Sequence, residues 1–142
     1  MESPLITVIT VSYNAASSIE QTIISVINQT YPHIEYIIID GGSTDNTVDI
    51  IKKYADKISY WVSEPDKGIY DAMNKGIKIA AGKYTLFMNV NDTFYASSSI
   101  AEVCNLMEKY DSQHDAYYGN VAVSNEYGLY ICLLYTSPSP RD

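Results

Sequence analysis

Polar residues that could bind a ligand follow four apolar segments of this chain, at points where buried strands would end. They are Tyr13-Asn14, Asp40-Gly41-Gly42, Glu64 to Lys67 and Asn89 to Asp92. Carboxylate oxygens such as those of Asp92 suit a hard divalent cation, and an aromatic ring can stack on a nucleobase. The pattern therefore indicates a ligand-binding site, while a solvated turn is the alternative for Asp92.

The charge of the chain limits the partners of such a site. The net charge is -8, which argues against a nucleic acid or an anionic membrane surface as the main partner. An anionic ligand would have to bring a cation with it. Lys67 is the only basic residue that we expect near the four strand ends, and it is either a ligand of such an anion or an ordinary solvated loop lysine.

Alternating strands and helices must position these polar residues. Runs rich in β-branched and aromatic residues predict strands at 5–11, 34–40, 58–64, 83–89 and 116–123. Apolar residues at helical spacing lie between them, with a capping box at Ser17 and Glu20, a helix end at Gly82 and a further helix from Ser99. This alternation predicts an α/β fold with a mainly parallel sheet and helices on both faces. Ligands of such sheets bind beyond the carboxyl ends of the strands, where all four polar groups fall.

The length and the two ends of the chain bear on its organisation. The 142 residues are enough for one compact domain. The N-terminus lacks the basic region of a secretory signal, and no apolar run reaches the length of a membrane span. The segment CLLYTSPSPRD at 132–142 resembles the translation of a sequencing adapter. We therefore expect 1–131 to be a truncated native domain and 132–142 to be non-native, with a Ser/Pro-rich disordered tail as the alternative.

Several nucleotide-binding and catalytic motifs are missing from the sequence. The turn after the first strand, SYNAASS, has no glycine, which excludes a G-x-G-x-x-G dinucleotide clamp. There is no P-loop and no G-x-S-x-G elbow. His33 and His114 are isolated, which favours ordinary surface histidines, and Cys104 and Cys132 lack metal-ligand spacing.

Three blocks of sequence together resemble the family 2 glycosyltransferases of GT-A fold, especially those that make bacterial surface polysaccharides. The blocks are VITVSYNAASSIEQTIISVINQTYPHIEYIIIDGGSTDNT, SEPDKGIYDAMNKGI and AAGKYTLFMNVNDTFY, and the resemblance covers 4–123. It implies a GT-A, Rossmann-like sheet that is incomplete at the C-terminus. It also implies transfer of a sugar, with inversion, from a nucleoside diphosphate sugar to a polysaccharide or lipid-linked glycan.

The resemblance also assigns donor-binding roles to single residues. Tyr13 would stack on the base and Asn14 would hydrogen-bond nearby, with core packing as the alternative for Tyr13. Asp40 would face the base and ribose, and capping of the GGSTDNT turn through backbone N–H groups is an equally open role. Gly41 stands where many members carry a second acidic residue that reads the base.

The resemblance places a metal site at the end of the fourth strand, in the segment NVND. Asp92 would coordinate Mg²⁺ or Mn²⁺ bound to the diphosphate, and Asn91 stands where many members have another aspartate. One carboxylate is sufficient, because Mg²⁺ is commonly held by one or two carboxylates plus phosphates and water. Such a cation would neutralise the diphosphate and stabilise it as a leaving group. Lys67 could contact a phosphate.

Other acidic and polar residues near these strand ends have weaker assignments. Asp66 and Asp71 are candidates for contacts to the donor sugar, although Asp45 and Asp71 can also favour helix N-termini. Met73 occupies a position where many members have an arginine, and Asn74 is expected to brace the loop. The family's general base lies downstream of YYGNVAV, so we name no catalytic residue and expect the fragment to be inactive.

An inverting glycosyltransferase is thus the predicted function, and a nucleotide-sugar-binding module without transfer activity is the alternative. A phosphoacceptor signalling domain would need paired acids after the first strand, and SYN does not supply them. The expected partners are a nucleoside diphosphate sugar and a glycan or lipid-linked acceptor, and not a nucleic acid. The expected location is the cytoplasm, with association of the intact protein with the inner face of the membrane left open.

Overall fold

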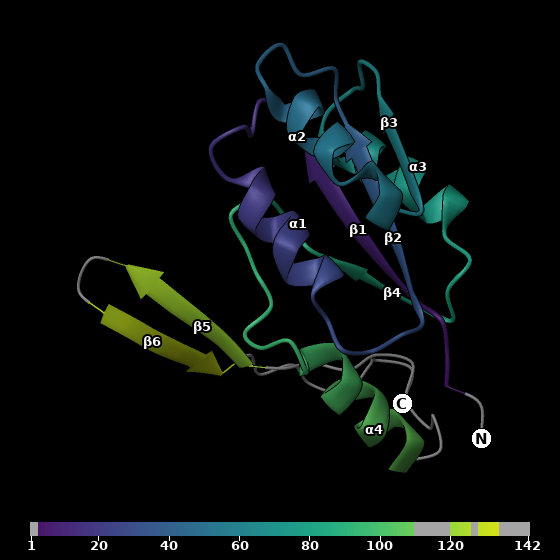
Figure 1. The fold of residues 1–142 in the computed structure, drawn as a ribbon, viewed down its shortest axis with the longest axis vertical. Helices are drawn as coiled ribbons and strands as arrows, with labels where there is room; N and C mark the ends of the chain where they lie inside the picture. The colour runs from purple at the N-terminus through teal and green to yellow at the C-terminus, as the bar shows by residue number, and fades with distance from the viewer. Residues whose placement is uncertain (1–2, 110–119, 126–127, 134–142) are drawn as a thin grey trace. The chain divides into compact units, whose positions relative to one another are not determined.

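The computed structural model describes residues 3–109, 120–125 and 128–133 (Figure 1). The chain forms two compact units, Met1–Cys104 and Asn105–Asp142. The first unit contains the four predicted strand ends. Within the described residues, no helix has both the length and the apolar character needed to cross a bilayer.

A four-stranded parallel sheet forms the first unit and confirms the predicted α/β fold. Its strands are β1 (Ile6–Ser12), β2 (Ile34–Asp40), β3 (Tyr60–Ser63) and β4 (Tyr84–Phe87), in the order β3-β2-β1-β4. The central pair is in register along its whole length, from Ile6 opposite Ile34 to Ser12 opposite Asp40. Because these two strands end at the same level, the residues that follow them lie at one edge of the sheet.

Helices cover both faces of this sheet. They are α1 (Ile19–Ile27), α2 (Thr47–Lys53), the short 3₁₀ helix η1 (Ala55–Lys57) and α3 (Ile69–Ile79). Side chains alternate along a strand, and Ile9 and Val11 of β1 belong to a buried cluster with Ala72 of α3. Val8 and Thr10 point to the opposite face and are also buried. On that face α1 and α2 contact each other (Figure 1).

The start of α1 differs from the predicted capping box. The helix begins at Ile19, its N-cap residue is Ser18, and no side-chain hydrogen bond caps it. Glu20 instead accepts hydrogen bonds from Lys53 Nζ at 2.9 Å and from the Tyr54 hydroxyl at 2.6 Å. The predicted reciprocal contact is therefore absent here, because Glu20 links α1 to the end of α2.

Gly82 has a different role from the predicted helix end. The helix α3 ends at Ile79 with Ala80 as its C-cap. A Cβ atom on Gly82 would lie 2.4 Å from Thr7 Oγ1 and 2.6 Å from Thr7 N, and the Gly82 N–H donates to Thr7 Oγ1 at 2.9 Å. The glycine therefore allows the segment before β4 to pass directly over β1.

We expect Gly82→Ala to destabilise the protein by about 1–3 kcal/mol, because β1 backbone cannot move away from the new methyl group. Gly76→Ala is the matched control. The three atoms nearest its Cβ would belong to the side chain of Ile9, the nearest at 2.8 Å, and alanine favours the helix, so we expect a smaller loss than at Gly82. Urea denaturation followed by circular dichroism measures both changes. Equal losses of stability in the two variants would contradict the role assigned to Gly82.

The second unit contains an antiparallel hairpin, as the segment SNEYG predicted. Its strands are β5 (Asn120–Asn125) and β6 (Gly128–Leu133), and Asn120 lies opposite Leu133. Residues 116–119 of the predicted fifth strand, and His114, lie outside the described residues. β6 includes Cys132 and Leu133, which the sequence analysis had excluded from the fold. The assignment of 132–142 as non-native stays a prediction, and 134–142 also lie outside the described residues. The helix α4 (Ser99–Lys109) begins at the predicted Ser99, with its first residues in the first unit and the rest in the second.

Candidate functional site

The carboxylate of Asp40 joins the ends of three strands. Asp40 is the last residue of β2 and is 0% exposed. Its Oδ1 accepts hydrogen bonds from Ser12 Oγ at 2.7 Å and Ser43 Oγ at 2.6 Å. Its Oδ2 accepts from Ser63 Oγ at 2.7 Å, Ser43 N at 2.8 Å and Gly42 N at 3.2 Å. The loops after β1, β2 and β3 are therefore held together by one buried anion.

The ionisation of Asp40 follows from these contacts. Burial raises the pKa of Asp40, but hydrogen bonds from Ser43, Ser12 and Ser63 outweigh burial and leave the pKa below its ordinary value. Both oxygens are occupied by protein donors, and the observed contacts are those of the turn-capping alternative. Direct contact between Asp40 and a base or ribose stays a prediction.

The loop after β1 presents one exposed aromatic ring. Tyr13 is 63% exposed, so the core-packing alternative for this residue is wrong. Asn14 follows with φ of 48°, and its N–H donates to Ser43 Oγ at 2.8 Å. The Asn14 Oδ1 accepts from Thr44 N at 2.8 Å. Asn14 therefore fixes the loop that carries Tyr13 to the turn after β2.

Asp45 links the same two loops through further hydrogen bonds. Its Oδ2 accepts from Ala16 N at 3.2 Å, and its Oδ1 accepts from Thr47 N at 3.0 Å. Hydrogen bonding from the Thr47 side chain lowers the pKa of Asp45. Since α2 begins at Thr47, the expected place of Asp45 at a helix N-terminus is confirmed.

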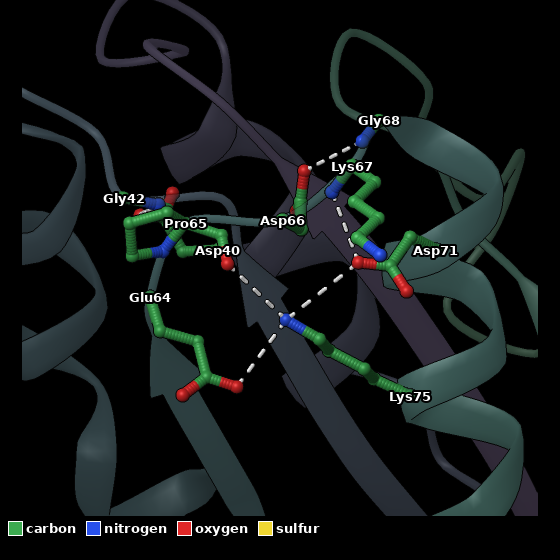
Figure 2. Close-up of polar contacts among 9 residues, drawn as sticks. All are labelled: Asp40, Gly42, Glu64, Pro65, Asp66, Lys67, Gly68, Asp71 and Lys75. Carbon is green, nitrogen blue, oxygen red and sulfur yellow. Dashed lines mark hydrogen bonds and ion pairs between the residues drawn. The ribbon is translucent and has the colours of Figure 1, made fainter.

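The loop between β3 and α3 packs against the turn after β2 (Figure 2). Glu64 N donates to Asp40 O at 3.0 Å. Gly42 has φ of 85°, and a Cβ there would lie 3.2 Å from Pro65 N. A Cβ on Gly41 would lie 2.8 Å from Asp66 Oδ2. Two consecutive glycines therefore let this loop approach the end of β2 closely.

Lys75 braces this loop, which the sequence analysis did not anticipate. Its Nζ lies 3.2 Å from Glu64 Oε1, 3.9 Å from Asp71 Oδ2 and 3.5 Å from Pro65 O (Figure 2). The expectation that Lys67 is the only cation near the strand ends is therefore wrong. Asn74, expected to brace the loop, is exposed, and its side chain makes no hydrogen bond to another described residue. The i, i+4 spacing of Asp71 and Lys75 was the sequence pattern that could have indicated this role.

Lys67 and Asp71 lie at the start of α3. The Lys67 N–H donates to Asp71 Oδ2 at 2.9 Å, so Asp71 fixes the residue that precedes the N-cap of the helix, Gly68 (Figure 2). The Lys67 side chain is exposed and forms no ion pair with another described residue. Lys67 is therefore available to an anionic ligand, whereas Lys75 is occupied by its carboxylate partners.

Asp92 ends a tight turn that follows β4. Asp92 N donates to Asn89 O at 3.1 Å, and Asn91 has φ of 75°, as the third residue of a type II turn requires. Thr22 Oγ1 of α1 donates to Asp92 O at 2.8 Å. The backbone is thus anchored, while the side chain of Asp92 is exposed.

The residues around Asp92 could bind a cation only if a ligand supplied further coordinating oxygen atoms. Within the described ranges, no group of three or more His, Cys, Asp or Glu side chains could hold a metal ion. A single exposed carboxylate suits Mg²⁺ or Mn²⁺ when phosphate oxygens and water complete the coordination. A metal held by protein side chains alone does not fit this turn.

A separate hollow of about 270 Å³ lies away from these loops. Its lining includes Ile34 and Tyr36 of β2, together with Val26, Pro32 and Lys57. Ile34 is the first residue of β2, so the hollow lies toward the amino end of that strand. It therefore does not coincide with the loops that hold Tyr13 and Asp66.

The comparisons with known proteins agree on one family. The model of Glycosyl transferase family 2 matches residues 7–132. A PGL/p-HBAD biosynthesis glycosyltransferase of Mycobacterium bovis is 32% identical over 124 residues, which are 85% of this chain and 48% of that protein. A putative teichuronic acid biosynthesis glycosyltransferase of Bacillus subtilis, TuaG, is 38% identical over 75% of this chain and 43% of its own length. The chain thus spans about half the length of these relatives or less.

A solved structure agrees with the fold. S. aureus TarS 1-349, in complex with UDP, superposes with a TM-score of 0.69 at 25% identity, over 75% of this chain and 33% of that one. The parallel sheet with its helices is therefore a GT-A fold, as the resemblance implied. Taken with the family match over 7–132, this shows that the chain belongs to glycosyltransferase family 2.

Proposed function

We propose that this chain is the donor-binding part of an inverting glycosyltransferase that uses a nucleoside diphosphate sugar. The observation that carries the proposal is the pair of exposed side chains, Tyr13 and Asp92, on loops that follow β1 and β4 of a family 2 sheet. The protein secures both loops through their backbones, which leaves the ring and the carboxylate available to a ligand. The crystal structure of TarS, a protein with the same fold, contains UDP.

Each part of the donor has a matching group in this arrangement. The ring of Tyr13 offers a stacking surface to the base, because every base has a π-face. Lys67 would contact the diphosphate directly, and the Asp92 carboxylate would hold it through a divalent cation, with Asn14, Asn91 and the Asp40–Gly41 turn as the supporting polar groups. A bound Mg²⁺ or Mn²⁺ would supply positive charge that stabilises the leaving diphosphate. Lys67 alone cannot balance an anion of this size in a chain of net charge -8.

The acceptor is proposed by class only. The relatives are glycosyltransferases of PGL/p-HBAD and teichuronic acid biosynthesis, which supports a polysaccharide or lipid-linked glycan acceptor. We assign no catalytic base, and we expect this fragment to bind the donor without transferring the sugar. A binding module without activity is the alternative. The intact protein would act in the cytoplasm, at the inner face of the membrane if its acceptor is lipid-linked.

Tyr13→Ala should weaken binding of the preferred nucleoside diphosphate by about 1–3 kcal/mol, the usual contribution of one stacked base. Tyr13→Phe keeps the ring and should lose far less. Isothermal titration with UDP, GDP, CDP and ADP in the presence of Mn²⁺ measures both effects. Because Tyr13 is 63% exposed, both variants should keep the wild-type melting temperature.

Two outcomes of this titration would count against the proposal. Equal losses of affinity in Tyr13→Ala and Tyr13→Phe would assign the contact to the hydroxyl group instead of the ring. A wild-type chain that binds none of the four nucleotides would remove the support for a donor site at this edge of the sheet.

A further inference from the structure

Three polar side chains lie along one side of α1 and its end, and we call Thr22, Ser25 and Gln29 the polar stripe. Thr22 is 0% exposed, and Ser25 and Gln29 are half-buried. Residues three and four positions apart are neighbours on a helix surface. Gln29 lies just beyond the last helical residue, Ile27, and its Nε2 donates to Ser25 O at 3.1 Å. The stripe therefore offers hydroxyl and amide groups on an otherwise apolar side of the helix.

The first two residues of the stripe hold the backbone at and after Asp92. The segment between β4 and α4 runs beside α1 and forms no helix or strand (Figure 1), so its backbone polar groups need other partners. Thr22 Oγ1 donates to Asp92 O at 2.8 Å. Phe94 N donates to Ser25 Oγ at 3.3 Å, and that hydroxyl donates to Thr22 O at 2.8 Å. The two hydroxyl groups thus fix alternate residues of this segment.

Gln29 holds the remainder of the same segment with both atoms of its amide. Its Nε2 donates to Ala96 O at 2.8 Å, and its Oε1 accepts from Ile100 N at 3.0 Å. The next residue adds a backbone contact, since Thr30 N donates to Ser97 O at 2.8 Å. The polar stripe therefore secures the chain continuously from Asp92 to the start of α4.

The turn that carries Asp92 is fixed at its other end by the sheet. Thr10 Oγ1 donates to Met88 O at 2.8 Å, and the hydroxyl of Tyr36 lies 2.8 Å from the same Thr10 oxygen. Because a hydroxyl group has one proton, which Thr10 gives to Met88, Tyr36 is the donor of this pair. Buried side chains thus hold the backbone on both sides of the turn, whereas the Asp92 carboxylate itself is exposed.

We propose, building on the proposed donor site, that Thr22 is a positioning residue for the Asp92 carboxylate in metal-bridged binding of the diphosphate, with Ser25 in support. A single carboxylate binds a hard cation well only where phosphate oxygens complete the coordination, so its position matters. A turn that moved freely would have to be ordered on binding, which weakens affinity. Thr22 reduces this loss because it fixes the carbonyl group of the residue that carries the carboxylate.

Thr22→Val tests this role in the full chain, since valine resembles threonine in shape and lacks the hydroxyl group. Thr22→Ser keeps the hydroxyl group and should restore the function. Thr7→Val is the matched control. Thr7 is also 0% exposed, and its Oγ1 donates to Glu35 Oε1 at 2.8 Å, but it lies near the amino end of β1. Isothermal titration with UDP, GDP, CDP and ADP, each in Mn²⁺ and in EDTA, gives the metal-dependent part of the affinity.

We expect Thr22→Val to weaken binding of the best of these nucleotides in Mn²⁺ by roughly two- to tenfold, the range for ordering one side chain on binding. Its affinity in EDTA should stay that of wild type, and Thr22→Ser should bind almost as wild type in both. Thr7→Val should lose stability in urea denaturation, as Thr22→Val does, but keep the metal-dependent affinity. A merely structural hydroxyl group would change stability alone.

Ser25→Ala is a second variant that does not depend on the stability of Thr22→Val. Alanine favours a helix more than serine does, so this variant should fold normally. Loss of the Ser25 hydroxyl group removes the contacts with Phe94 N and Thr22 O. We expect a loss of metal-dependent affinity in the same direction as for Thr22→Val and smaller in size.

The possible failures of this experiment are distinguishable. Wild-type metal-dependent affinity in both Thr22→Val and Ser25→Ala would overturn the inference and leave the proposed donor site intact. An equal loss in Thr7→Val would also overturn it, because general loosening of the fold would then be the cause. Equal losses in Mn²⁺ and in EDTA would exclude a role that acts through the metal. Absence of nucleotide binding by the wild-type chain, or binding that does not depend on Mn²⁺, would contradict the proposed function and the inference together.

Discussion

Asp92→Asn should abolish the metal-dependent part of nucleoside diphosphate binding. The substitution keeps the size of the side chain but removes the charge that a hard cation needs. The contacts of Asp92 with Asn89 and Thr22 involve its backbone only, so the turn should be unchanged. With Mn²⁺, the affinity of the variant should fall by on the order of 10- to 100-fold, the range of a lost charge-assisted contact. It should then equal the affinity of the wild-type chain in EDTA.

The control for this experiment is Asn91→Gly. Alanine would be a poor choice at position 91, because φ of 75° is unfavourable for a residue with a Cβ atom. Glycine accepts this conformation and removes only the amide, which is a weak ligand for Mg²⁺ or Mn²⁺. Isothermal titration with a nucleoside and with its diphosphate, each with and without EDTA, separates the metal from the base. Metal-independent diphosphate binding by the wild-type chain would make Asp92 an ordinary turn residue.

The central strands could be predicted from the sequence because a short run of β-branched residues fits a buried strand better than any other element. The residues from Ile6 to Ser12 are all buried, and a β-branched run of that length fits a strand covered on both faces. The edge strands were predicted too long. β3 and β4 have four residues each, whereas the apolar runs that predicted them have seven. The apolar run therefore continues beyond the residues that pair in each of these strands.

The role of Asp40 could not be decided from the sequence, since it depends on contacts between distant segments. Capping of the local turn was visible in the residues that follow Asp40. The hydrogen bonds from Ser12 and Ser63 come from residues 28 and 23 positions away. Only the parallel register of β1, β2 and β3 brings these hydroxyl groups to the same carboxylate.

The loop before α3 illustrates the same limit. Asp66, Lys67 and Asp71 could be recognised as polar residues at a strand end. That Asp66 would occupy the space beside Gly41, and that Lys75 would reach back to Glu64, depends on how the loop folds over the end of β2. Such contacts depend on how closely two segments of backbone approach each other. The sequence indicates a close approach only by the presence of glycine.

Asp40→Ala should produce the largest loss of stability among single substitutions at this site. Removal of the carboxylate leaves the hydroxyls of Ser12, Ser43 and Ser63 and two backbone N–H groups without their acceptor. Each buried donor left unsatisfied costs about 1–3 kcal/mol, and water entering the space would satisfy part of them. We therefore expect a total loss of about 3 kcal/mol or more, measured by urea denaturation. Ser63→Ala removes one donor only and should lose about 0.5–1.5 kcal/mol.

The acid stability of the protein should change with the same substitution. The pKa of Asp40 is lower in the folded state than its ordinary value, so the charged form stabilises the fold. This contribution is complete above the unfolded value of about 3.9 and is lost as the pH falls through the folded pKa. The wild-type chain should therefore lose stability over this acidic range more steeply than Asp40→Asn, after correction for the other carboxyl groups.

Asp40→Asn separates the structural role of Asp40 from a direct role in binding. Asparagine keeps one acceptor oxygen, but its amide N–H₂ would face donors such as Gly42 N and Ser63 Oγ. The variant should thus be clearly less stable than wild type at neutral pH. Nucleotide affinity, measured well below its denaturation midpoint, should fall only as far as the loops that carry Tyr13 and Asp66 are loosened. If Asp40→Asn keeps wild-type stability and loses nucleotide binding, the carboxylate contacts the ligand itself, and the five hydrogen bonds are secondary to that contact.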